Sequence, residues 1–151
     1  MLSFREMLNE DCTAVNVSVD NKNTALIKAV DLLSKNGKVL DKQKLLNDIL
    51  IRESMSSTGI GEGVAFPHTR SESVSGTMFA VLGLSKGVNF EAEDGNPVDI
   101  IFIIASPPEE TAINLQLLSK LARLLHDPDF RKAIREVQDN KSLAKLLYEK
   151  D

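Results

Sequence analysis

A histidine that follows a glycine-rich loop is the strongest chemical signal in this sequence. The loop spans residues 59–63, and its glycines allow tight bends in which main-chain N–H groups point into a shared concavity that suits an anion. His68 comes after a short apolar stretch and directly behind Pro67. Proline fixes its own φ and pushes Phe66 toward an extended conformation, so the backbone before His68 is stiffened. An imidazole beside an anion-binding loop suggests a phosphoryl group carried on histidine.

A histidine phosphocarrier has few chemical requirements. The accepting nitrogen must be unprotonated, which is easy because the ordinary pKa of histidine lies close to neutral. The other nitrogen needs a hydrogen-bond acceptor, and the phosphoryl oxygens need N–H, hydroxyl or guanidinium donors. Such transfer depends on positioning and charge stabilisation, so we expect no cofactor, neither a nucleotide nor a bound metal. Two histidines and one cysteine, widely spaced, also argue against a zinc site.

A set of short motifs extends this signal over the chain. The motifs are, in order, Arg52-Glu53, Ser57-Thr58-Gly59-Ile60-Gly61, Ala65-Phe66-Pro67-His68, Asn96-Pro97-Val98-Asp99 and Asn114-Leu115-Gln116-Leu117-Leu118. They resemble the signature of the enzyme IIA domains of the bacterial phosphoenolpyruvate-dependent phosphotransferase system, of the fructose/mannitol/nitrogen-regulatory type. The resemblance covers nearly the whole chain, from about residue 2 to residue 147. A lone Pro-His pair would be weak, but the ordered set is specific.

The resemblance implies roles for several residues. His68 would accept the phosphoryl group on Nε2, and Arg52 would be the guanidinium that stabilises it. The hydroxyl of Thr58 and the main-chain amides of Gly59 and Gly61 would bind phosphoryl oxygens. Structural alternatives stay open: a hydrogen-bonded histidine at a strand end, an arginine that complements a helix dipole, and a threonine and glycines that only form a turn.

Asp99 and Asn114 are expected near the site without contacting the phosphoryl group. A carboxylate at Asp99 would orient His68 or bond to neighbouring backbone, and it would repel a phosphoryl group at close range. The alternative is a strand-start residue that caps backbone groups. Many relatives carry histidine at the position of Asn114, and asparagine can donate a hydrogen bond but takes up neither charge nor a proton. Asn114 is otherwise a helix-surface or cap residue.

The composition is that of one soluble globular domain over residues 1–151, with 42% apolar and 26% charged residues. No apolar run approaches the roughly 20 residues of a membrane span, and the start lacks the layout of a signal peptide. The single cysteine, Cys12, fits a reducing cytoplasm, and no nearby basic group would activate its thiol. A net charge of −4 argues against nucleic-acid binding. We therefore expect a cytoplasmic protein that neither enters a membrane nor binds nucleic acid.

The apolar pattern predicts alternating strands and helices. An all-apolar run at residues 100–104 predicts a central strand that starts at Asp99 and is covered on both faces. Other strands are predicted at 14–19, 64–67 and 77–84, and helices near 4–8, 26–36, 41–55, 106–125, 127–134 and 143–147, with Thr111 as a competing start of the fourth helix. This order indicates an α/β layered sandwich. The resemblance implies a mixed central sheet with helices on both faces.

Three functions fit these observations. In the first, His68 receives a phosphoryl group from the histidine-containing phosphocarrier protein and passes it to a IIB domain of a fructose-like sugar permease, as a phosphotransferase component that uses no nucleotide. In the second, the protein is a nitrogen-regulatory type switch that binds and regulates transporters or kinases according to the state of His68. In the third, an α/β binding module carries a histidine that is never modified. An apolar docking patch is expected around His68, with Phe66 and Ile60 as candidates; for both residues a place in the core is the equal alternative.

Overall fold

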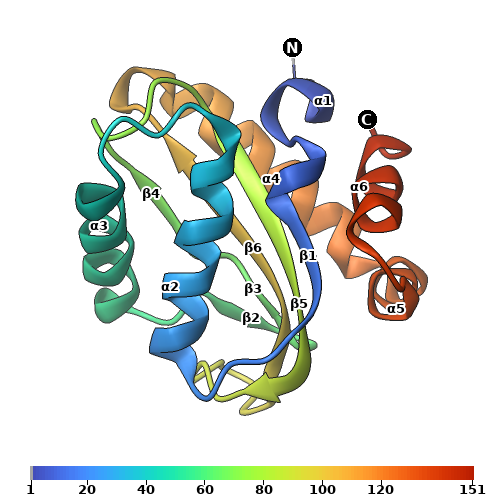
Figure 1. Ribbon diagram of the computed structural model, residues 1–151. Helices are drawn as coiled ribbons and strands as arrows, with labels where there is room; N and C mark the ends of the chain where they lie inside the picture. The colour runs from blue at the N-terminus through green and yellow to red at the C-terminus, as the bar shows by residue number, and fades with distance from the viewer. Residues whose placement is uncertain (1) are drawn as a thin grey trace.

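The computed structural model describes residues 2–151 and is built on a mixed β-sheet of six strands (Figure 1). The strands are β1 (Thr13–Val17), β2 (Gly59–Gly61), β3 (Val64–Ala65), β4 (His68–Arg70), β5 (Met78–Val88) and β6 (Val98–Ser106). The order across the sheet is β1-β5-β6-β3-β2, and β4 also pairs with β6. β5 and β6 are antiparallel, whereas β3 and β4 run parallel to β6. The predicted α/β class and mixed sheet are confirmed.

Helices cover both faces of this sheet. They are α1 (Phe4–Met7), α2 (Lys22–Leu33), α3 (Lys42–Met55), α4 (Thr111–His126), α5 (Pro128–Glu136) and α6 (Asn140–Tyr148), with short 3₁₀ turns at Glu10–Cys12, Ser34–Asn36 and Pro108–Glu110. In Figure 1, α2 crosses the near face with α3 beside it, and α4 lies behind the sheet. α6 packs against β1, and α3 packs against β4. The end of α3 and the start of α4 therefore both approach β4.

β6 is the centre of the core. Of its residues, all but Asp99 are buried. The strand pairs with β5 on one side and with β3 and β4 on the other, so both its edges and both its faces are covered. A continuous apolar run is the pattern of such a strand, because there is no solvent face to carry polar residues.

Helix ends follow the predicted cap residues. The Asp41 carboxylate accepts from the Lys44 amide and starts α3, and Asp127 accepts from the Asp129 amide and starts α5 behind Pro128. Gly37 ends the segment formed by α2 and the 3₁₀ turn that follows it. Its φ of 90° lies in the left-handed region, which glycine tolerates best. α3 begins after Asp41 and ends at Met55, so Arg52 falls on its last turn as predicted.

The strands around His68 differ from the prediction. A single strand is predicted at 64–67 with His68 at its end, but the structure has two short strands, β3 before Pro67 and β4 beginning at His68. Both lie along the same edge of β6: β3 pairs with Ile100 and Ile101, and His68 pairs with Ile104. Pro67 has no N–H and breaks the ladder, although its carbonyl still accepts from the Ile104 amide at 2.9 Å. His68 is thus at the start of a strand.

Other boundaries shifted for physical reasons. β5 runs to Val88, beyond the predicted end, because its pairing with β6 resumes after a register shift that follows Gly83. The α4 helix begins at Thr111, the competing start, and the residues before it form a 3₁₀ turn. β2 is missing from the prediction, since its three residues carry no strand pattern.

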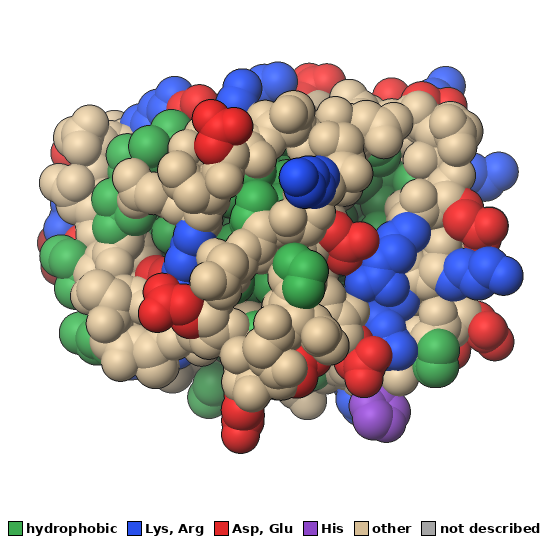
Figure 2. All heavy atoms as spheres, turned by 90° about the horizontal axis from the view of Figure 1, so that it is seen from below, with side chains coloured by type: hydrophobic (Ala, Val, Ile, Leu, Met, Phe, Trp, Pro, Cys, Tyr) green, Lys and Arg blue, Asp and Glu red, His purple; other side chains and the backbone are tan. Residues whose placement is uncertain are grey.

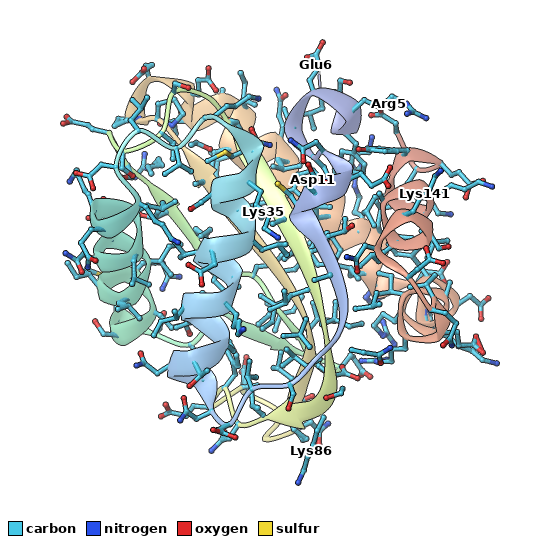
Figure 3. All side chains as sticks on the ribbon, in the orientation of Figure 1. Arg5, Glu6, Asp11, Lys35, Lys86 and Lys141 are labelled. Carbon is cyan, nitrogen blue, oxygen red and sulfur yellow. The ribbon has the colours of Figure 1, made fainter. Side chains whose placement is uncertain are left out.

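The outer surface is mixed in charge. The labelled side chains of Glu6, Lys86 and Lys141 point away from the body of the fold (Figure 3). Seen from below, basic side chains lie next to acidic ones (Figure 2). Among the helices within residues 2–151, we find none with the length and apolar character needed to cross a membrane.

A clamp fixes the β2–β3 turn to α5. Arg135 donates from Nε and Nη2 to the Asp99 carboxylate at 3.0 and 2.9 Å, and Nη2 also donates to the Glu62 carbonyl at 2.8 Å. Gly63 lies directly under this ion pair at φ 77°. A Cβ on Gly63 would lie 2.5 Å from Arg135 Nη2 and 2.8 Å from Asp99 Oδ1, so a side chain there would force the clamp apart.

We predict that Gly63→Ala destabilises the protein more than Gly95→Ala does. Gly95 has nearly the same φ, 74°, but no atom lies within 4 Å of the position that its Cβ would take, so it reports backbone strain alone, about 1 kcal/mol. Gly63→Ala should lose about 1 kcal/mol more, because it also breaks an exposed ion pair and its hydrogen bond to the turn. Urea unfolding of both variants, alone and with Arg135→Ala, measures this. The clamp would be contradicted if Gly63→Ala and Gly95→Ala lost the same free energy of unfolding. It would also be contradicted if Gly63→Ala still lost more than Gly95→Ala when both are combined with Arg135→Ala.

Candidate functional site

His68 lies in a surface cleft of roughly 1030 Å³ between α3, β4 and the start of α4. Arg52 and Met55 line it from the last turn of α3, and Asn114 and Leu115 line it from α4. The cleft forms because β4 is a short strand at the sheet edge, and neither α3 nor α4 covers it completely. Of the predicted site residues, the fold brings His68, Arg52 and Asn114 together here.

The ring of His68 is held by one short hydrogen bond. Nδ1 lies 2.8 Å from the carbonyl oxygen of Phe66. A carbonyl oxygen only accepts, so Nδ1 carries a proton, and in the neutral ring the free lone pair is therefore on Nε2. The hydrogen bonds within residues 2–151 give Nε2 no protein partner, and the half-buried ring lines the cleft. The arrangement provides a nucleophilic nitrogen of defined position.

The Phe66 carbonyl is itself fixed from two sides. Its amide donates to the Thr58 carbonyl at 3.0 Å. Its ring is 5% exposed and packs against Phe102, with ring centroids 5.8 Å apart. Phe66 is therefore a core residue, and the prediction that it belongs to a docking patch is wrong. Its contribution to the cleft is the main-chain oxygen that orients His68.

Arg52 enters the cleft from the end of α3. Its Nη1 donates to the Ser56 carbonyl at 3.1 Å, which ties the guanidinium to the loop that follows the helix. Nη1 also donates to Ser56 Oγ at 3.5 Å, so both printed bonds come from this nitrogen and the N–H groups of Nε and Nη2 remain. The remaining donors are available to an anion in the cleft. The positive charge of Arg52 also interacts favourably with the helix dipole, because it lies at the C-terminus of α3.

Asn114 is buried, rather than a helix-surface or cap residue. It is 4% exposed in the first turns of α4, and its Nδ2 donates to Ser106 Oγ at 2.6 Å. This bond anchors the start of α4 to the end of β6. Asn114 also lines the cleft, where its amide adds a neutral polar group.

Thr58, Gly59 and Gly61 do not lie in the cleft. The Thr58 hydroxyl, predicted to bind phosphoryl oxygens, donates to Glu53 Oε1 at 2.6 Å, and its amide donates to Glu53 Oε2 at 2.9 Å. Gly59 and Gly61 form β2, which pairs with β3 and not with β4. The glycine-rich segment is a hairpin, so its amides do not form the anion-binding loop that its composition suggested.

Asp99 is also remote from His68. It forms the ion pair with Arg135 described above. His68 pairs with Ile104, five residues further along β6, which is about 16 Å at the rise of a β-strand. The Phe66 carbonyl, rather than the Asp99 carboxylate, orients the imidazole.

The cleft contains groups that sequence reasoning missed. Arg70 lies two residues after His68 on β4, so both side chains leave the same face of the strand. Arg70 lines the cleft and donates to Thr111 Oγ1 at 3.1 Å. Lys44 also lines it, with its Nζ 3.5 Å from the carboxylate of Asp48, and Glu72 adds a second acidic group. The sequence predicts a strand before His68 but none after it. With a strand at 68–70, the two-residue spacing would have placed Arg70 beside His68.

An apolar rim surrounds these cations. Ile51, Met55 and Leu115 line the cleft and are 56%, 74% and 60% exposed. Ile60, the other predicted docking residue, is also exposed but lies outside the cleft, on β2. Exposed apolar residues around a polar centre are typical of a protein-docking surface. The spacing of Ile51 and Met55, four residues apart on a helix, was the available signal.

The remaining reactive side chains lie elsewhere. Cys12 is buried, and burial raises the pKa of its thiol to about 11, which disfavours a reactive thiolate. His126 is exposed at the end of α4 and does not line the cleft. No three acidic, cysteine or histidine side chains within residues 2–151 gather closely enough to hold a metal ion.

The sequence is similar to two kinds of known protein. The chain is 33% identical over 150 residues to the fructose-specific EIIABC component of Bacillus subtilis, a match that covers 99% of this chain but 24% of that protein. It is 30% identical over 149 residues to the nitrogen regulatory protein of Pseudomonas aeruginosa, which covers 99% of this chain and 97% of that protein. The chain therefore spans about a quarter of the first relative and nearly all of the second.

The fold and the family model lead to the same result. The crystal structure of nitrogen regulatory protein IIA-Ntr from Neisseria meningitidis superimposes with a TM-score of 0.87 at 30% identity, over 94% of this chain and 97% of that one. The model of the phosphoenolpyruvate-dependent sugar phosphotransferase system EIIA 2 family matches residues 6–150. The chain belongs to this EIIA 2 family of phosphotransferase-system components.

Proposed function

We propose that His68 is a phosphoryl carrier: Nε2 accepts a phosphoryl group from a phosphohistidine of the histidine-containing phosphocarrier protein and passes it to a IIB domain of a fructose-like permease. The hydrogen bond between His68 Nδ1 and the Phe66 carbonyl is the observation that carries this proposal. In the neutral ring this bond leaves the lone pair on Nε2, at a cleft that a second protein can reach.

The transfer needs little from the protein beyond position and charge. The lone pair of Nε2 forms a bond to phosphorus while the donor's N–P bond breaks and its electron pair returns to the donor nitrogen. His68 becomes positively charged as it attacks, and the Phe66 carbonyl stabilises that charge on Nδ1–H. Arg52 faces the phosphoryl oxygens, whose negative charge a guanidinium stabilises with charge-assisted hydrogen bonds.

The exposed rim suits a partner protein. Two imidazoles must approach within bonding distance of one phosphorus, so the partner has to dock closely over the cleft. Ile51, Met55 and Leu115 provide apolar area for this contact, and Arg52, Arg70 and Lys44 would attract a phosphorylated partner. The name of the Bacillus relative joins A, B and C components, which supports a IIB domain as acceptor.

A second function is supported by the other group of relatives. The Pseudomonas nitrogen regulatory protein matches over nearly its whole length, and the Neisseria IIA-Ntr has the same fold. In this alternative, His68 is phosphorylated in the same way, but the output is binding to a transporter or kinase. A phosphoryl group would add negative charge inside the apolar rim and so change which partner binds there.

We predict that incubation with phosphoenolpyruvate, enzyme I and the histidine-containing phosphocarrier protein labels the wild type but not His68→Ala. The reason is that no other described histidine lies in the cleft. His126→Ala is the matched control, because it removes the other histidine and should keep full labelling. Label on His68→Ala, or loss of label in His126→Ala, would refute the site.

We further predict that labelled protein loses its phosphoryl group within seconds when a fructose-type IIB domain is added. Radiolabel on both proteins, followed on a gel against time, measures this. Transfer to the IIB domain supports transport. A label that stays on His68 with every IIB domain offered, while binding of a transporter or kinase changes with phosphorylation, would reject transport in favour of the switch.

A further inference from the structure

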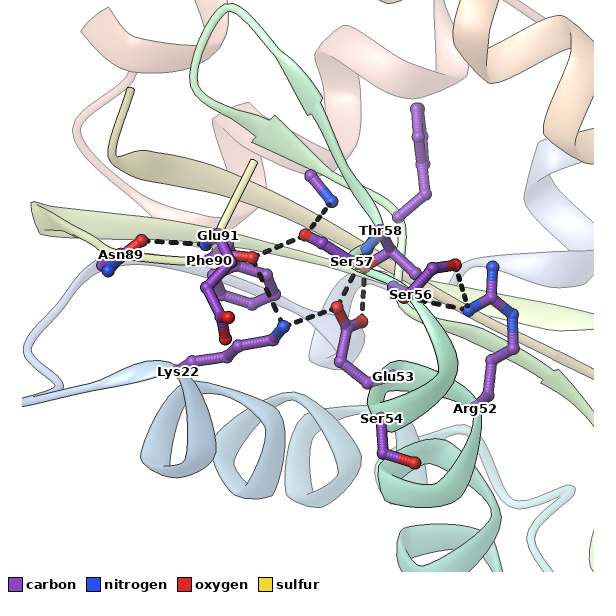
Figure 4. A network of polar contacts seen from close by, with 12 residues as sticks. Lys22, Arg52, Glu53, Ser54, Ser56, Ser57, Thr58, Asn89, Phe90 and Glu91 are labelled. Carbon is purple, nitrogen blue, oxygen red and sulfur yellow. Dashed lines mark hydrogen bonds and ion pairs between the residues drawn. The ribbon is translucent and has the colours of Figure 1, made fainter. Parts of the chain in front are cut away.

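Glu53 is a buried carboxylate that the proposed transfer does not use. It follows Arg52 on α3 and is 6% exposed. Its oxygens accept the amide and hydroxyl of Thr58 at 2.9 and 2.6 Å, and Lys22 Nζ from α2 lies 2.8 Å away (Figure 4). A buried carboxylate is costly unless it is paired and hydrogen-bonded, and Glu53 meets both conditions.

The same network joins other segments to this carboxylate. Lys22 Nζ also donates to the Phe90 carbonyl at 3.3 Å and lies 5.2 Å from the Phe90 ring centroid. Ser57 Oγ donates to that carbonyl at 2.5 Å and accepts from the Gly59 amide at 3.0 Å (Figure 4). The loop after α3 is therefore held between α2 and the segment that follows β5.

Two short paths lead from Glu53 to the cleft. In the first, Glu53 fixes Thr58, the Thr58 carbonyl accepts from the Phe66 amide at 3.0 Å, and the Phe66 carbonyl accepts from His68 Nδ1 at 2.8 Å. In the second, Glu53 and Thr58 hold the two ends of the loop that contains Ser56, whose carbonyl accepts from Arg52. One carboxylate is thus connected by short hydrogen-bond paths to both His68 and Arg52.

We propose that Glu53, charge-balanced by Lys22, is a positioning residue that sets the tautomer of His68 and the place of the Arg52 guanidinium. The effect of Glu53 on the rate of phosphorylation rests on the proposed phosphoryl transfer, whereas its effect on the His68 tautomer does not. Consecutive residues on a helix point about 100° apart, so Arg52 turns into the cleft while Glu53 turns inward to the loop that organises it. In this proposal the Arg52-Glu53 and Ser57-Thr58-Gly59 motifs act together to position the groups of the cleft.

The test separates positioning from stability. Glu53→Leu with Lys22→Met removes both charges together and also the acceptor of Thr58, so no charge is left buried without a partner. The matched control is Glu53→Gln with Lys22→Met, which is equally uncharged but keeps a carbonyl that accepts from the Thr58 amide and an NH₂ group that can donate to the Thr58 hydroxyl oxygen. Thr58→Val is a milder variant that keeps the backbone bond and loses only the hydroxyl.

Two readouts are needed. The ¹⁵N chemical shifts of the His68 ring, measured without any partner protein, report the tautomer. We expect the Nδ1–H form in the wild type and in the Gln control, and a mixture with Nε2–H in the Leu variant and to a lesser degree in Thr58→Val. The labelling rate should fall about tenfold or more in the Leu variant, the scale found when a group that orients a functional histidine is removed. The rate in the Gln control should stay near that of the wild type.

The outcomes are decisive in either direction. A folded Leu variant that keeps the Nδ1–H tautomer and the wild-type labelling rate would overturn the proposal. If that variant does not fold, a wild-type tautomer and rate in Thr58→Val would overturn it. Failure of the wild type itself to accept label would refute the proposed function, while the tautomer comparison would still test the role of Glu53.

Discussion

The proposed phosphoryl transfer depends on the hydrogen bond from His68 Nδ1 to the main-chain oxygen of Phe66. Imidazole has two nitrogens of similar basicity, and only one of them can be offered to a phosphorus atom at a time. A backbone carbonyl selects between them without adding a charge that would repel a phosphoryl group. A carboxylate in the same place would select equally well, but it would bring negative charge toward an anion.

The rest of the structure supports this carbonyl. The Phe66 ring is anchored in the core against Phe102, and Pro67 restricts the backbone of Phe66 itself to extended conformations. The Pro67 carbonyl accepts a hydrogen bond from the Ile104 amide in β6, the central strand of the sheet. The sheet therefore holds the backbone on both sides of the peptide that carries the acceptor. The ring of His68 can only reach that acceptor in one orientation, which presents Nε2 to the cleft.

The sequence was most predictive where local chemistry decides structure. The cap residues Asp41 and Asp127, the apolar run of β6 and the last-turn position of Arg52 all follow from short-range rules. Thr58 and Asp99 were misplaced because their partners, Glu53 and Arg135, are chosen by the tertiary fold. Neither pairing leaves a pattern in the spacing. Glycine content likewise did not distinguish an anion-binding loop from the β2–β3 hairpin.

The most direct test of this account is to find which ring nitrogen carries the phosphoryl group. Protein labelled with ¹⁵N-histidine and phosphorylated through the histidine-containing phosphocarrier protein would be examined for coupling between ¹⁵N and ³¹P. The account predicts coupling at Nε2 of His68, with Nδ1 still protonated and bonded to Phe66. Phosphorus attached to Nδ1 would contradict it, since that nitrogen cannot be both the donor to the carbonyl and the acceptor of the group.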